Sequence, residues 1–460
     1  MKLTSEQTTA IELSQTKPVL VITGGPGTGK TTVCRQIIDM AQSHGRSVLC
    51  AAPTGKAAKR LSEQTGRPAS TIHRLLRWKP SIGGFTVNEK NPFCEDVIII
   101  DEMSMVGTSL FNSILKAVNP PTKLILVGDV DQLPSISYGN TLSDIINSGI
   151  VPVVRLTQIH RQSENSWISE NAQRINTGQK IYENNSTSED FFFFERETPE
   201  QVFDAIVYLI TKIVGGKYKI DPIRDTQVLC PQWKSPVGVT IFNKKLQEIM
   251  NPSSNTKPEY KMGDTIFRQG DKVIHTRNNY SLGAFNGEVG IITDIDTDFG
   301  ETLISVDFYD RIVQYENKKD IAELQLCYAM TIHKSQGSEY RAVIIPCHST
   351  NSFMLSRPLL YTAVTRGKEL VQIVGNRKGL NRAIRNNNVL QRNTLLCDRL
   401  RSDDDFPAMD WTYLADSHGC VVDVCERLMG GCESITSTKS KVVGLTTDDY
   451  NSSYDDELPF

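Results

Sequence analysis

The chain has 460 residues, a length that fits two or three domains with cores of their own rather than one. Hydrophobic residues make up 39% and charged residues 22%, the usual globular mix, and no apolar run reaches the ~18 residues that a membrane-spanning helix needs. The ten cysteines stand singly without CxxC pairs, and the N-terminus lacks the pattern of a signal peptide. We therefore expect reduced thiols and a cytoplasmic location, in a bacterial or phage-infected cell.

The net charge of −3 hides an asymmetry along the chain. Residues 401–460 contain thirteen Asp and Glu but four Lys and Arg, a balance of −9, so residues 1–400 carry +6. A mildly basic body with an acidic tail is compatible with a polyanionic partner. It does not by itself indicate one, because many enzymes that never contact nucleic acid carry a similar charge.

The first 150 residues alternate short apolar runs with stretches of helical pattern. The runs are rich in Val, Ile and Leu and are bounded by turn residues, as buried parallel strands are. They are Val19–Thr23, Ser47–Ala52, Asp96–Ile100 and Lys123–Val127. This alternation predicts a doubly wound α/β domain over residues 1–150. Residues 79–95, rich in Gly, Pro and Asn, predict a hairpin inserted into it.

A second α/β unit is predicted over residues 151–261 and 325–400. Its expected strands are Gln227–Cys230, Ala342–Pro346 and Leu370–Gly375. Between its two parts, over residues 262–324, the apolar period changes to two, which predicts a small inserted β-barrel. Residues 401–460 lose clear periodicity and are expected to form an acidic, partly disordered tail.

The segment GGPGTGKTT, from Gly24 to Thr32, follows the first apolar run and opens a predicted helix. Glycines at such a turn let backbone N–H groups surround a triphosphate, and the helix N-terminus adds positive potential. We expect Lys30 to reach the β- and γ-phosphates and the Thr31 hydroxyl to bind Mg²⁺. A chance glycine-rich turn is disfavoured because strand, helix and the Lys-Thr pair occur together. The residues expected to bind ATP here are Gly25, Gly27, Thr28, Gly29, Lys30, Thr31 and Thr32.

Two carboxylates, Asp101 and Glu102, directly follow the apolar run that ends at Ile100. Because the carboxyl ends of parallel strands meet at one edge, this pair is expected beside the phosphate loop. Asp101 is the candidate ligand of Mg²⁺ through water, and Glu102 is the candidate base that polarises the attacking water. Gln132, in GDVDQLPS after the next run, has a side chain suited to sense a γ-phosphate. Taken singly, each of these segments could be a plain cap or turn.

These residues indicate only a nucleoside triphosphatase. Four further segments carry small polar residues, His and Lys at predicted loops, which suits contacts to a sugar-phosphate backbone and to stacked bases. They are AAPTGKAAKRL from Ala51, TIHRLL from Thr71, TIHKSQGSEY from Thr331 and YTAVTRGK from Tyr361. Arg366, in the second unit, suits an arginine that senses the γ-phosphate across the cleft between the two units.

This ordered set of motifs resembles the superfamily 1B helicases of the RecD-like branch, which includes the phage Dda helicase. The likeness covers about residues 3–380 and also includes LTSEQ from Leu3, DEMSMV from Asp101 and a short RQ at Arg161. It implies two RecA-like domains with ATP between them, single-stranded DNA across their tops and 5′→3′ movement. Bacterial members carry a long N-terminal extension, whereas the phosphate loop here starts at Gly24, so we expect a shorter motor of phage-like size.

The resemblance also implies roles for single residues. Gln7 is expected to read adenine, Glu339 to lie near the ribose, and Arg161 and Arg366 to reach the γ-phosphate from the second domain. The residues implied to line the DNA path are Pro53, Thr54, His73, Thr331, His333 and Lys334. The hairpin at 79–95 is implied to be the strand-separating pin with Phe85 as its aromatic, and the 262–324 unit an SH3-like domain.

Three further features have competing interpretations. The end of the tail resembles the acidic tip of bacterial single-strand-binding proteins: Asp455, Asp456, Glu457, Leu458, Pro459 and Phe460. It could recruit proteins that bind such tips, compete with DNA for the basic channel, or only solubilise the chain. Cys420, Cys425 and Cys432 could bind zinc with His418, but the spacing lacks a CxxC knuckle and favours incidental cysteines. Phe191–Phe194 predict a buried strand rather than a base-stacking platform.

From the sequence we predict a DNA helicase that couples hydrolysis of ATP with Mg²⁺ to 5′→3′ stepping on single-stranded DNA, in replication, recombination or repair. Two alternatives stay open. One is a translocase that strips proteins from DNA or drives branch migration with little unwinding. The other is a partner-dependent, DNA-stimulated ATPase without unwinding of its own. RNA is the less favoured substrate.

Overall fold

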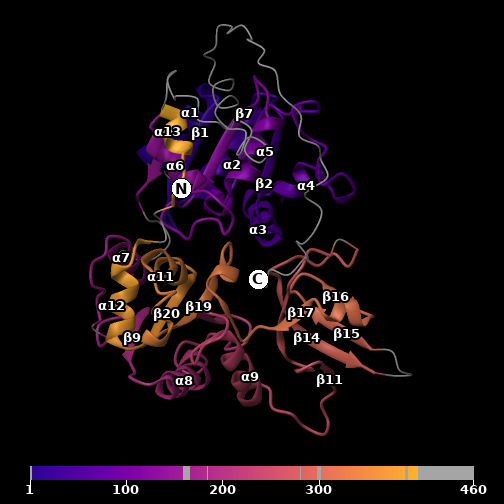
Figure 1. The fold of residues 1–460 in the computed structure, drawn as a ribbon, viewed down its shortest axis with the longest axis vertical. Coiled ribbons are helices and arrows are strands. Elements are labelled where there is room, and N and C mark those ends of the chain that lie inside the picture. The colour runs from indigo at the N-terminus through magenta and orange to yellow at the C-terminus, as the bar shows by residue number, and fades with distance from the viewer. Residues whose placement is uncertain are drawn as a thin grey trace, which may run out of the picture.

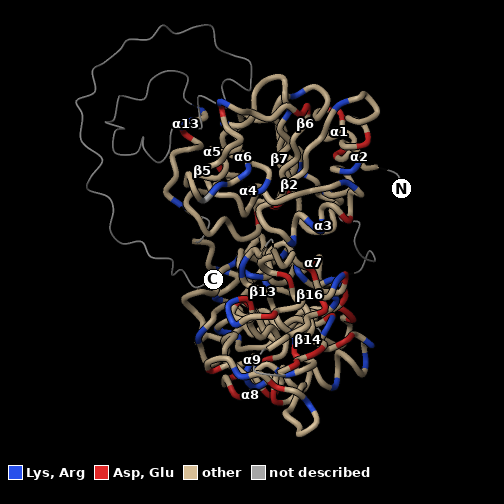
Figure 2. Tube along the Cα trace, turned by 90° about the vertical axis from the view of Figure 1, so that its right-hand side faces the viewer, with Lys and Arg blue, Asp and Glu red and all other residues tan. Residues whose placement is uncertain are grey.

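Three sheets organise the chain in the computed structural model, which describes residues 3–158, 166–183, 185–279, 281–297, 302–388 and 392–401. Figure 1 shows the first sheet and its helices as an upper body, with the other two sheets beside each other in a lower body. Figure 2, turned by 90°, shows acidic and basic positions spread over both bodies. None of the helices in the described ranges is both long and apolar enough to cross a bilayer.

The first sheet has six parallel strands in the order β3-β2-β6-β7-β1-β8. They are β1 (Val19–Gly24), β2 (Val48–Ala52), β3 (Ala69–Thr71), β6 (Val97–Ile100), β7 (Lys123–Gly128) and β8 (Val153–Leu156). Four of them lie on the predicted apolar runs. The central strands are buried on both faces, as parallel strands between two helix layers are, so the predicted doubly wound sheet is confirmed.

Helices cover both faces of this sheet. They are α1 (Ser5–Thr16), α2 (Lys30–Ser43), α3 (Gly55–Thr65), α4 (Ile72–Leu75), α5 (Thr108–Ala117) and α6 (Thr141–Ser148). The buried residues of α2 recur at intervals of three or four and so form one face of the helix: Val33, Cys34, Ile37, Ile38 and Ala41. This face packs with Leu20 and Ile22 of β1, which fixes the N-terminus of α2 beside the end of that strand.

The second sheet has five parallel strands in the order β18-β10-β19-β20-β9. They are β9 (Phe191–Glu195), β10 (Thr226–Cys230), β18 (Ala329–Thr331), β19 (Tyr340–Cys347) and β20 (Gly367–Gly375). The helices around it are α7 (Trp167–Asn176), α8 (Pro199–Tyr208), α9 (Val239–Met250), α11 (Arg357–Val364) and α12 (Arg377–Arg385). A π-helix, Leu209–Val214, continues α8. The three runs predicted for this sheet and the buried strand at Phe191–Phe194 are confirmed.

The third sheet is antiparallel, in the order β16-β15-β14-β13-β17. Its strands are β13 (Lys272–His275), β14 (Val289–Asp296), β15 (Leu303–Asp307), β16 (Ile312–Tyr315) and β17 (Leu324–Leu326), and the short α10 (Lys318–Ile321) precedes β17. A separate hairpin pairs β11 (Glu259–Met262) with β12 (Thr265–Arg268). This sheet lies in the chain between α9 and β18, where the change to period two predicted a β unit.

Two segments join the first body from outside its predicted range of 1–150. β8 pairs with β1, with Val21 opposite Val153, so the first sheet runs past the predicted boundary. Residues 392–400, predicted to end the second domain, and Arg401, predicted to start the tail, return to the first body, where α13 (Leu396–Arg401) packs against α6. A four-residue strand and a six-residue helix are compatible with either body, so only the tertiary contacts decide which one each joins.

The predicted hairpin is shorter than residues 79–95. β4 (Trp78–Lys79) pairs with β5 (Gly84–Phe85), and Trp78 lies opposite Phe85. The short 3-10 helix Pro80–Ile82 forms the turn between the two strands. The hairpin therefore begins one residue earlier than predicted and includes a tryptophan that the prediction left out.

Asp271, at the start of β13, joins the third sheet to the second. Its buried carboxylate accepts hydrogen bonds from Gln247 Nε2 at 2.6 Å and Asn251 Nδ2 at 2.7 Å, both on or next to α9. Tyr328 Oη donates to it at 2.8 Å, and the backbone N–H of Arg268 does so at 2.8 Å. Burial raises the pKa of Asp271 despite these donors. The four donors are thus positioned by one carboxylate.

We expect Asp271→Ala to lower the free energy of unfolding by about 3 kcal/mol or more, because several buried donors lose their acceptor at once. Urea denaturation followed by circular dichroism measures this. Asp294→Ala is the matched control, because Asp294 is an exposed aspartate of the neighbouring strand, and we expect a change within about 0.5 kcal/mol. Equal effects of the two substitutions would contradict the role given to Asp271.

Candidate functional site

The loop from Gly24 to Lys30 turns back over the end of β1 and starts α2. Gly27 and Gly29 have φ of 75° and 86°, which L side chains rarely adopt, so the turn depends on glycine at both positions. The Lys30 ammonium donates to the carbonyls of Gly24 at 2.6 Å and Gly25 at 2.9 Å. The lysine therefore lies folded against its own loop, with its charge at the N-terminus of α2.

Gln7, predicted to read adenine, contacts the same loop. It is buried, and its Nε2 donates to the carbonyl of Thr28 at 3.2 Å. Its Oε1 accepts from the backbone N–H of Thr4 at 3.1 Å, within the capping box that starts α1. Both ends of the amide are thus bound within the protein. Gln7 couples α1 to the phosphate loop in this arrangement.

Asp101 and Glu102 lie at the carboxyl end of β6. Burial, and then the neighbouring Glu102 carboxylate, raise the pKa of Asp101 above its usual range. The Glu102 N–H donates to Asp101 Oδ1 at 2.8 Å. Glu102 has φ 53° and ψ 41°, a left-handed conformation that costs a non-glycine residue free energy and that concentrates at functional sites. Glu102 lines the cavity beside the loop.

One cavity of about 880 Å³ brings most of the predicted nucleotide residues together. From the first body it is lined by Gly27, Gly29, Lys30, Thr31, Thr32, Asp101, Glu102 and Gln132, and from the second by Glu339 and Arg366. It also includes residues that the sequence did not single out: Arg35, Gln36, Asp39, Arg60, Gln64, Lys368 and Glu369. The cavity therefore lies between two RecA-like sheets, with cations contributed from both sides.

Arg366 and Glu339 enter this cavity from the second body. Arg366 is 3% exposed and its guanidinium donates to the carbonyls of Thr362 at 3.1 Å and Ser338 at 3.2 Å. Glu339 forms ion pairs with Arg60 of α3 at 2.7 Å and with Lys368 at 3.2 Å. The Arg60 pair crosses from one body to the other. These contacts hold both side chains at the cavity wall.

The segment after β7 contacts the second body through hydrogen bonds. The Tyr361 hydroxyl of α11 donates to Asp129 Oδ2 at 3.0 Å, and Gln132 Nε2 donates to the same oxygen at 3.0 Å. The Leu133 N–H donates to the hydroxyl of Thr362 at 2.9 Å, and its carbonyl accepts from Gln336 Nε2 at 3.1 Å. Gln132 is therefore positioned by a carboxylate that the second body also binds.

A smaller cavity of about 220 Å³ lies on the other side of this contact. It brings together five of the seven residues predicted to bind DNA, which are Pro53, Thr54, Thr331, His333 and Lys334. Residues that the sequence analysis missed complete it: Met105, Ile136, Asn278, Asn286, Gly287 and Gln336. All three sheets contribute to this groove. The third sheet supplies Asn278, Asn286 and Gly287, which lie in the connection between β13 and β14.

The two walls of the groove are built alike. Thr54 caps α3 by accepting from the Ala57 N–H at 3.2 Å, and Thr331 accepts from the Lys334 N–H at 3.3 Å. Thr54 lies two residues after the end of β2, Thr331 is the last residue of β18, and a lysine follows each of them within three residues. Burial lowers the pKa of Lys56 to about 8 and lowers that of Lys334. The groove therefore holds two partly desolvated amines, which favours an anion that can replace the lost water.

His73 and Phe85 do not line this groove. They lie together at the hairpin, where their ring centroids are 5.8 Å apart. Phe85 packs partly into the core of the first body, and its ring lies edge-on to Trp78 at 5.0 Å. Trp78 is 45% exposed, so the tryptophan, rather than Phe85, is the large ring that the hairpin presents to solvent.

Some predicted residues lie outside the described part of the chain. They are Arg161, His418, Cys420, Cys425, Cys432 and the acidic end Asp455–Phe460. Among the described residues, no group of three or more His, Cys, Asp and Glu side chains could hold a metal ion by itself. At the nucleotide cavity, Thr31 and Asp101 supply a hydroxyl and a carboxylate, the oxygen donors that suit Mg²⁺ when phosphate oxygens complete the set.

Three family profiles match the chain in order. The AAA domain matches residues 2–190, the SH3 domain of ATP-dependent RecD-like DNA helicases matches residues 242–308, and the UvrD-like helicase C-terminal domain matches residues 326–374. The first range covers the first sheet, the second covers much of the antiparallel unit, and the third covers β18, β19 and β20. The fold and the cavity between the sheets thus define a P-loop protein of the helicase class.

Related proteins narrow this class. The ATP-dependent RecD2 DNA helicase of Deinococcus radiodurans is 34% identical over 400 residues, 87% of this chain and 53% of that protein. The RecBCD enzyme subunit RecD of Mycolicibacterium smegmatis is 31% identical over 86% of this chain and 75% of that subunit. This chain thus spans about half the length of the RecD2 relative and three quarters of the RecD subunit. It belongs to the RecD-like family of superfamily 1B helicases.

Solved structures of Pif1 helicases share the fold. The Pif1 helicase of Candida albicans superposes with a TM-score of 0.54 at 18% identity, over 85% of this chain and 97% of that one. Bacteroides Pif1 in complex with ADP-AlF3 and single-stranded DNA gives 0.53 at 20% identity, over 91% and 98%. At these sequence identities the superposition shows a shared fold.

We expect Tyr361→Phe to lower the free energy of unfolding by about 1–2 kcal/mol, because the buried Asp129 carboxylate loses one of its two side-chain donors. ATP hydrolysis is expected to fall as well, since the same carboxylate positions Gln132. Thermal unfolding and a steady-state ATPase assay measure the two effects. Tyr138→Phe, at a tyrosine that is 88% exposed, is the control and is expected to change neither. A full ATPase rate in Tyr361→Phe would contradict the positioning of Gln132 through Asp129.

Proposed function

We propose that this protein is an ATP-driven motor that moves 5′→3′ on single-stranded DNA and separates duplex DNA ahead of it. The observation that carries the proposal is the cavity between the two parallel sheets, where Lys30 and Arg366 approach from opposite bodies. A cavity shared in this way closes when a triphosphate bridges it and relaxes when the γ-phosphate is released. Hydrolysis can therefore move one body relative to the other.

The hydrolysis step is assigned to residues of the first body. Lys30 exchanges the Gly24 and Gly25 carbonyls for phosphate oxygens of ATP, and the Glu102 carboxylate accepts a proton from the attacking water. Thr31 and Asp101 would hold Mg²⁺, which would supply charge that stabilises the phosphates. The buried position of Asp101 favours its use as a ligand, because a bound cation offsets the loss of hydration that raises its pKa.

Two further side chains are assigned to γ-phosphate sensing. Gln132 lies at the cavity while its amide is bound to Asp129, so a bound phosphate can change the contact that Asp129 shares with Tyr361. Arg366 uses its donors on the Thr362 and Ser338 carbonyls and has to exchange some of them to reach a phosphate. Arg161 and Glu339 keep the roles implied by the family: a second arginine at the γ-phosphate and a contact near the ribose.

The groove on the far side of the same contact is assigned to single-stranded DNA. Pro53, Thr54, Thr331 and His333 line it, and Lys56 and Lys334 supply positive charge. Burial lowers the pKa of His333, so this imidazole is neutral near pH 7 and can contact bases or sugars without adding charge. Because its walls come from different bodies, closure at the nucleotide cavity changes the spacing between the two grips on the strand.

The experiment that tests the proposal compares two matched duplexes, one with a 5′ and one with a 3′ single-stranded overhang, in the presence of ATP and Mg²⁺. We expect unwinding from the 5′ overhang only. Lys30→Ala is expected to lower ATP hydrolysis and unwinding by about 100-fold or more, because the phosphates lose their main cation, while DNA binding persists. Lys244→Ala, an exposed lysine of α9 far from the cavity, is the control.

Four other outcomes would each contradict one part of the proposal. Unwinding from the 3′ overhang alone would contradict the assigned polarity. DNA-stimulated ATP hydrolysis without unwinding of either duplex would replace the helicase by a translocase or a partner-dependent ATPase. Stimulation by RNA in place of DNA would contradict the substrate. Normal hydrolysis by Lys30→Ala would contradict the assignment of the nucleotide cavity.

The hairpin formed by β4 and β5 is assigned to strand separation. Its exposed face is the Trp78 ring, supported from behind by Phe85 and His73. A flat ring of this kind can stack on the terminal base pair of a duplex as the two strands part.

We expect Trp78→Ala to lower the unwinding rate several-fold and to leave the ATPase activity stimulated by single-stranded DNA within about twofold, since the hairpin lies outside the nucleotide cavity and the groove. A strand-displacement assay and an ATPase assay on the same preparation make the comparison. Ile82→Ala is the control, because Ile82 is 62% exposed at the turn of the same hairpin but offers no ring. Loss of both activities in Trp78→Ala would instead indicate damage to the first body.

We also propose a reducing compartment, the cytoplasm, as the site of action. The cysteines of the described ranges are free thiols, and five of them are buried: Cys34, Cys50, Cys230, Cys327 and Cys347. Burial raises the pKa of these thiols, which keeps them protonated and unreactive.

A further inference from the structure

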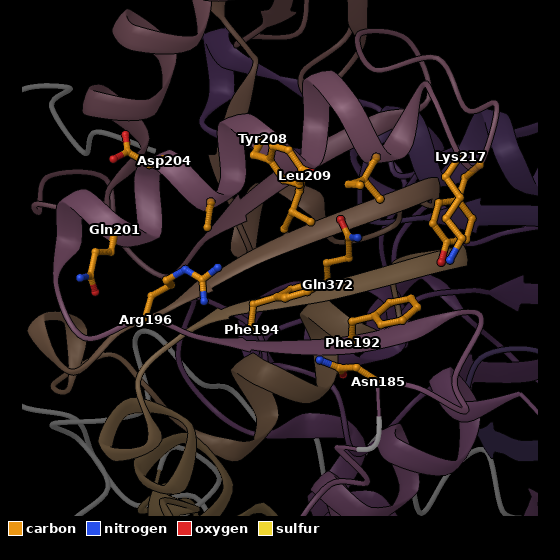
Figure 3. Close-up of a pocket in the computed structure, with 13 residues that line it drawn as sticks. Asn185, Phe192, Phe194, Arg196, Gln201, Asp204, Tyr208, Leu209, Lys217 and Gln372 are labelled. Atoms are coloured by element: carbon orange, nitrogen blue, oxygen red, sulfur yellow. The ribbon is translucent and has the colours of Figure 1, made fainter.

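A cavity of about 540 Å³ lies in the second body, away from both sites described above. It is bounded on one side by β9 and β20 at the edge of the second sheet and on the other by α8 and the π-helix that follows it (Figure 3). Its volume lies within the range of sites that bind small molecules in proteins. No residue of the nucleotide cavity or of the DNA groove lines it.

One wall of this cavity is flat and aromatic. Phe192 and Phe194 lie on the same face of β9, with ring centroids 6.1 Å apart and planes 18° apart. Asn185 binds the backbone of Phe193 through both ends of its amide, at 2.8 and 3.2 Å, and so fixes the outer edge of this strand. The backbone N–H and carbonyl of Phe193 are therefore both hydrogen-bonded, which holds this edge of the strand in place. The aromatic wall offers the kind of surface on which planar rings stack.

Gln372 of β20 extends into the cavity from this apolar wall. Its neighbours in the sheet register are Ile344 and Phe192, and Figure 3 shows its amide directed from the strand toward Leu209 on the opposite side. The side chain is 1% exposed, and its Oε1 has no hydrogen-bond partner among the described residues. A buried amide without a partner costs free energy, and such groups concentrate where a ligand or water supplies the missing contact.

α8 and the π-helix form the wall of the cavity opposite the aromatic rings. Leu209 and Ile213 of the π-helix, with Ala205 of α8, face the aromatic wall across the cavity. A π-helical turn is rare and often accompanies functional sites, because the wider turn shifts the side chains that follow it. The small side chain of Ala205 leaves room between the walls.

Charged side chains lie at the mouth. Figure 3 shows Arg196 at one end of the cavity and Lys217 at the other, with Asp204 on α8 beyond Arg196. Arg196 donates to its neighbouring carbonyl at Glu195, and the Lys217 ammonium lies 5.2 Å from the ring of Tyr218. The mouth thus offers two cations to a substituent that reaches out of the apolar interior.

We propose that this cavity binds a nucleobase, with adenine as the preferred base. A glutamine amide pairs with adenine through two bonds, in which its oxygen accepts from the exocyclic amine and its nitrogen donates to a ring nitrogen. The unpartnered Oε1 of Gln372 lacks such a donor, and the rings of Phe192 and Phe194 supply the stacking surface. The base comes either from a free nucleoside or nucleotide or from single-stranded DNA.

The test is a calorimetric titration of the full chain with adenosine, which lacks the phosphates on which binding to Lys30 depends. We expect saturable binding that weakens about tenfold or more in Gln372→Leu, which removes the amide and keeps the volume. Ala205→Trp, which fills the cavity from the helix side, is expected to abolish it. Lys30→Ala is expected to retain it.

Thermal unfolding separates a binding role from a structural one. Without ligand, Gln372→Leu is expected to unfold at the same temperature as the wild type or higher, because a buried amide oxygen without a hydrogen-bond partner is removed. Added adenosine is expected to raise the unfolding temperature of the wild type and not of this variant. The absence of saturable adenosine binding to the wild type, or wild-type affinity for adenosine in both cavity variants, would overturn the proposal.

Two oligonucleotides of equal length, one of deoxyadenosine and one of thymidine, distinguish the sources of the base. Tighter binding of the adenine strand that Gln372→Leu reduces to the level of the thymine strand supports DNA as the source. Equal binding of both strands, together with adenosine binding that depends on Gln372, supports a free nucleoside or nucleotide.

Discussion

The contact between the segment after β7 and the second body is the interaction on which the rest of the arrangement depends. Asp129 accepts from both Gln132 and Tyr361, and Leu133 is bound on both its N–H and its carbonyl. Gln132 faces the nucleotide cavity, while Ile136, a few residues later, faces the groove. A single short segment therefore lines the nucleotide cavity on one side and the groove proposed for DNA on the other. The polar groups of this segment are buried and hydrogen-bonded, so a partial displacement would leave them without partners. The segment is therefore suited to a switch between discrete states.

Much of the fold follows from local sequence. Buried parallel strands carry continuous Val, Ile and Leu, so Val19–Gly24 and Val97–Ile100 could be predicted without any tertiary information. The phosphate loop could be predicted too, because its chemistry depends on neighbours in the chain. The short pieces could not. No local feature assigns β8 to the first sheet or returns α13 to it. Trp78 gives no sign that it is the exposed ring of a hairpin until its pairing with Phe85 is known.

The site residues divide in the same way. Lys30, Asp101, Glu102 and Arg366 belong to motifs and lie around one cavity. The residues that the sequence analysis missed are recognised only by contacts with residues distant in the sequence. Arg60 pairs with Glu339, and Tyr361 donates to Asp129. Asn278 lines the groove together with residues of the other two sheets. Gln372 shows most clearly what the sequence alone does not reveal. A glutamine within Leu370–Gly375 has no evident role until the apolar neighbouring strands and the cavity beside them are known.

The return of α13 to the first body has a consequence for how the two bodies move. The chain crosses between them after β8 and again before α13, where Arg392 donates to the carbonyls of Ser137 and Gly139. The second body is thus tethered to the first at both of its ends, so both connections limit any movement between the two bodies. A second tether lowers the configurational entropy of the separated arrangement, so less entropy is lost when the two bodies come together than with a single tether.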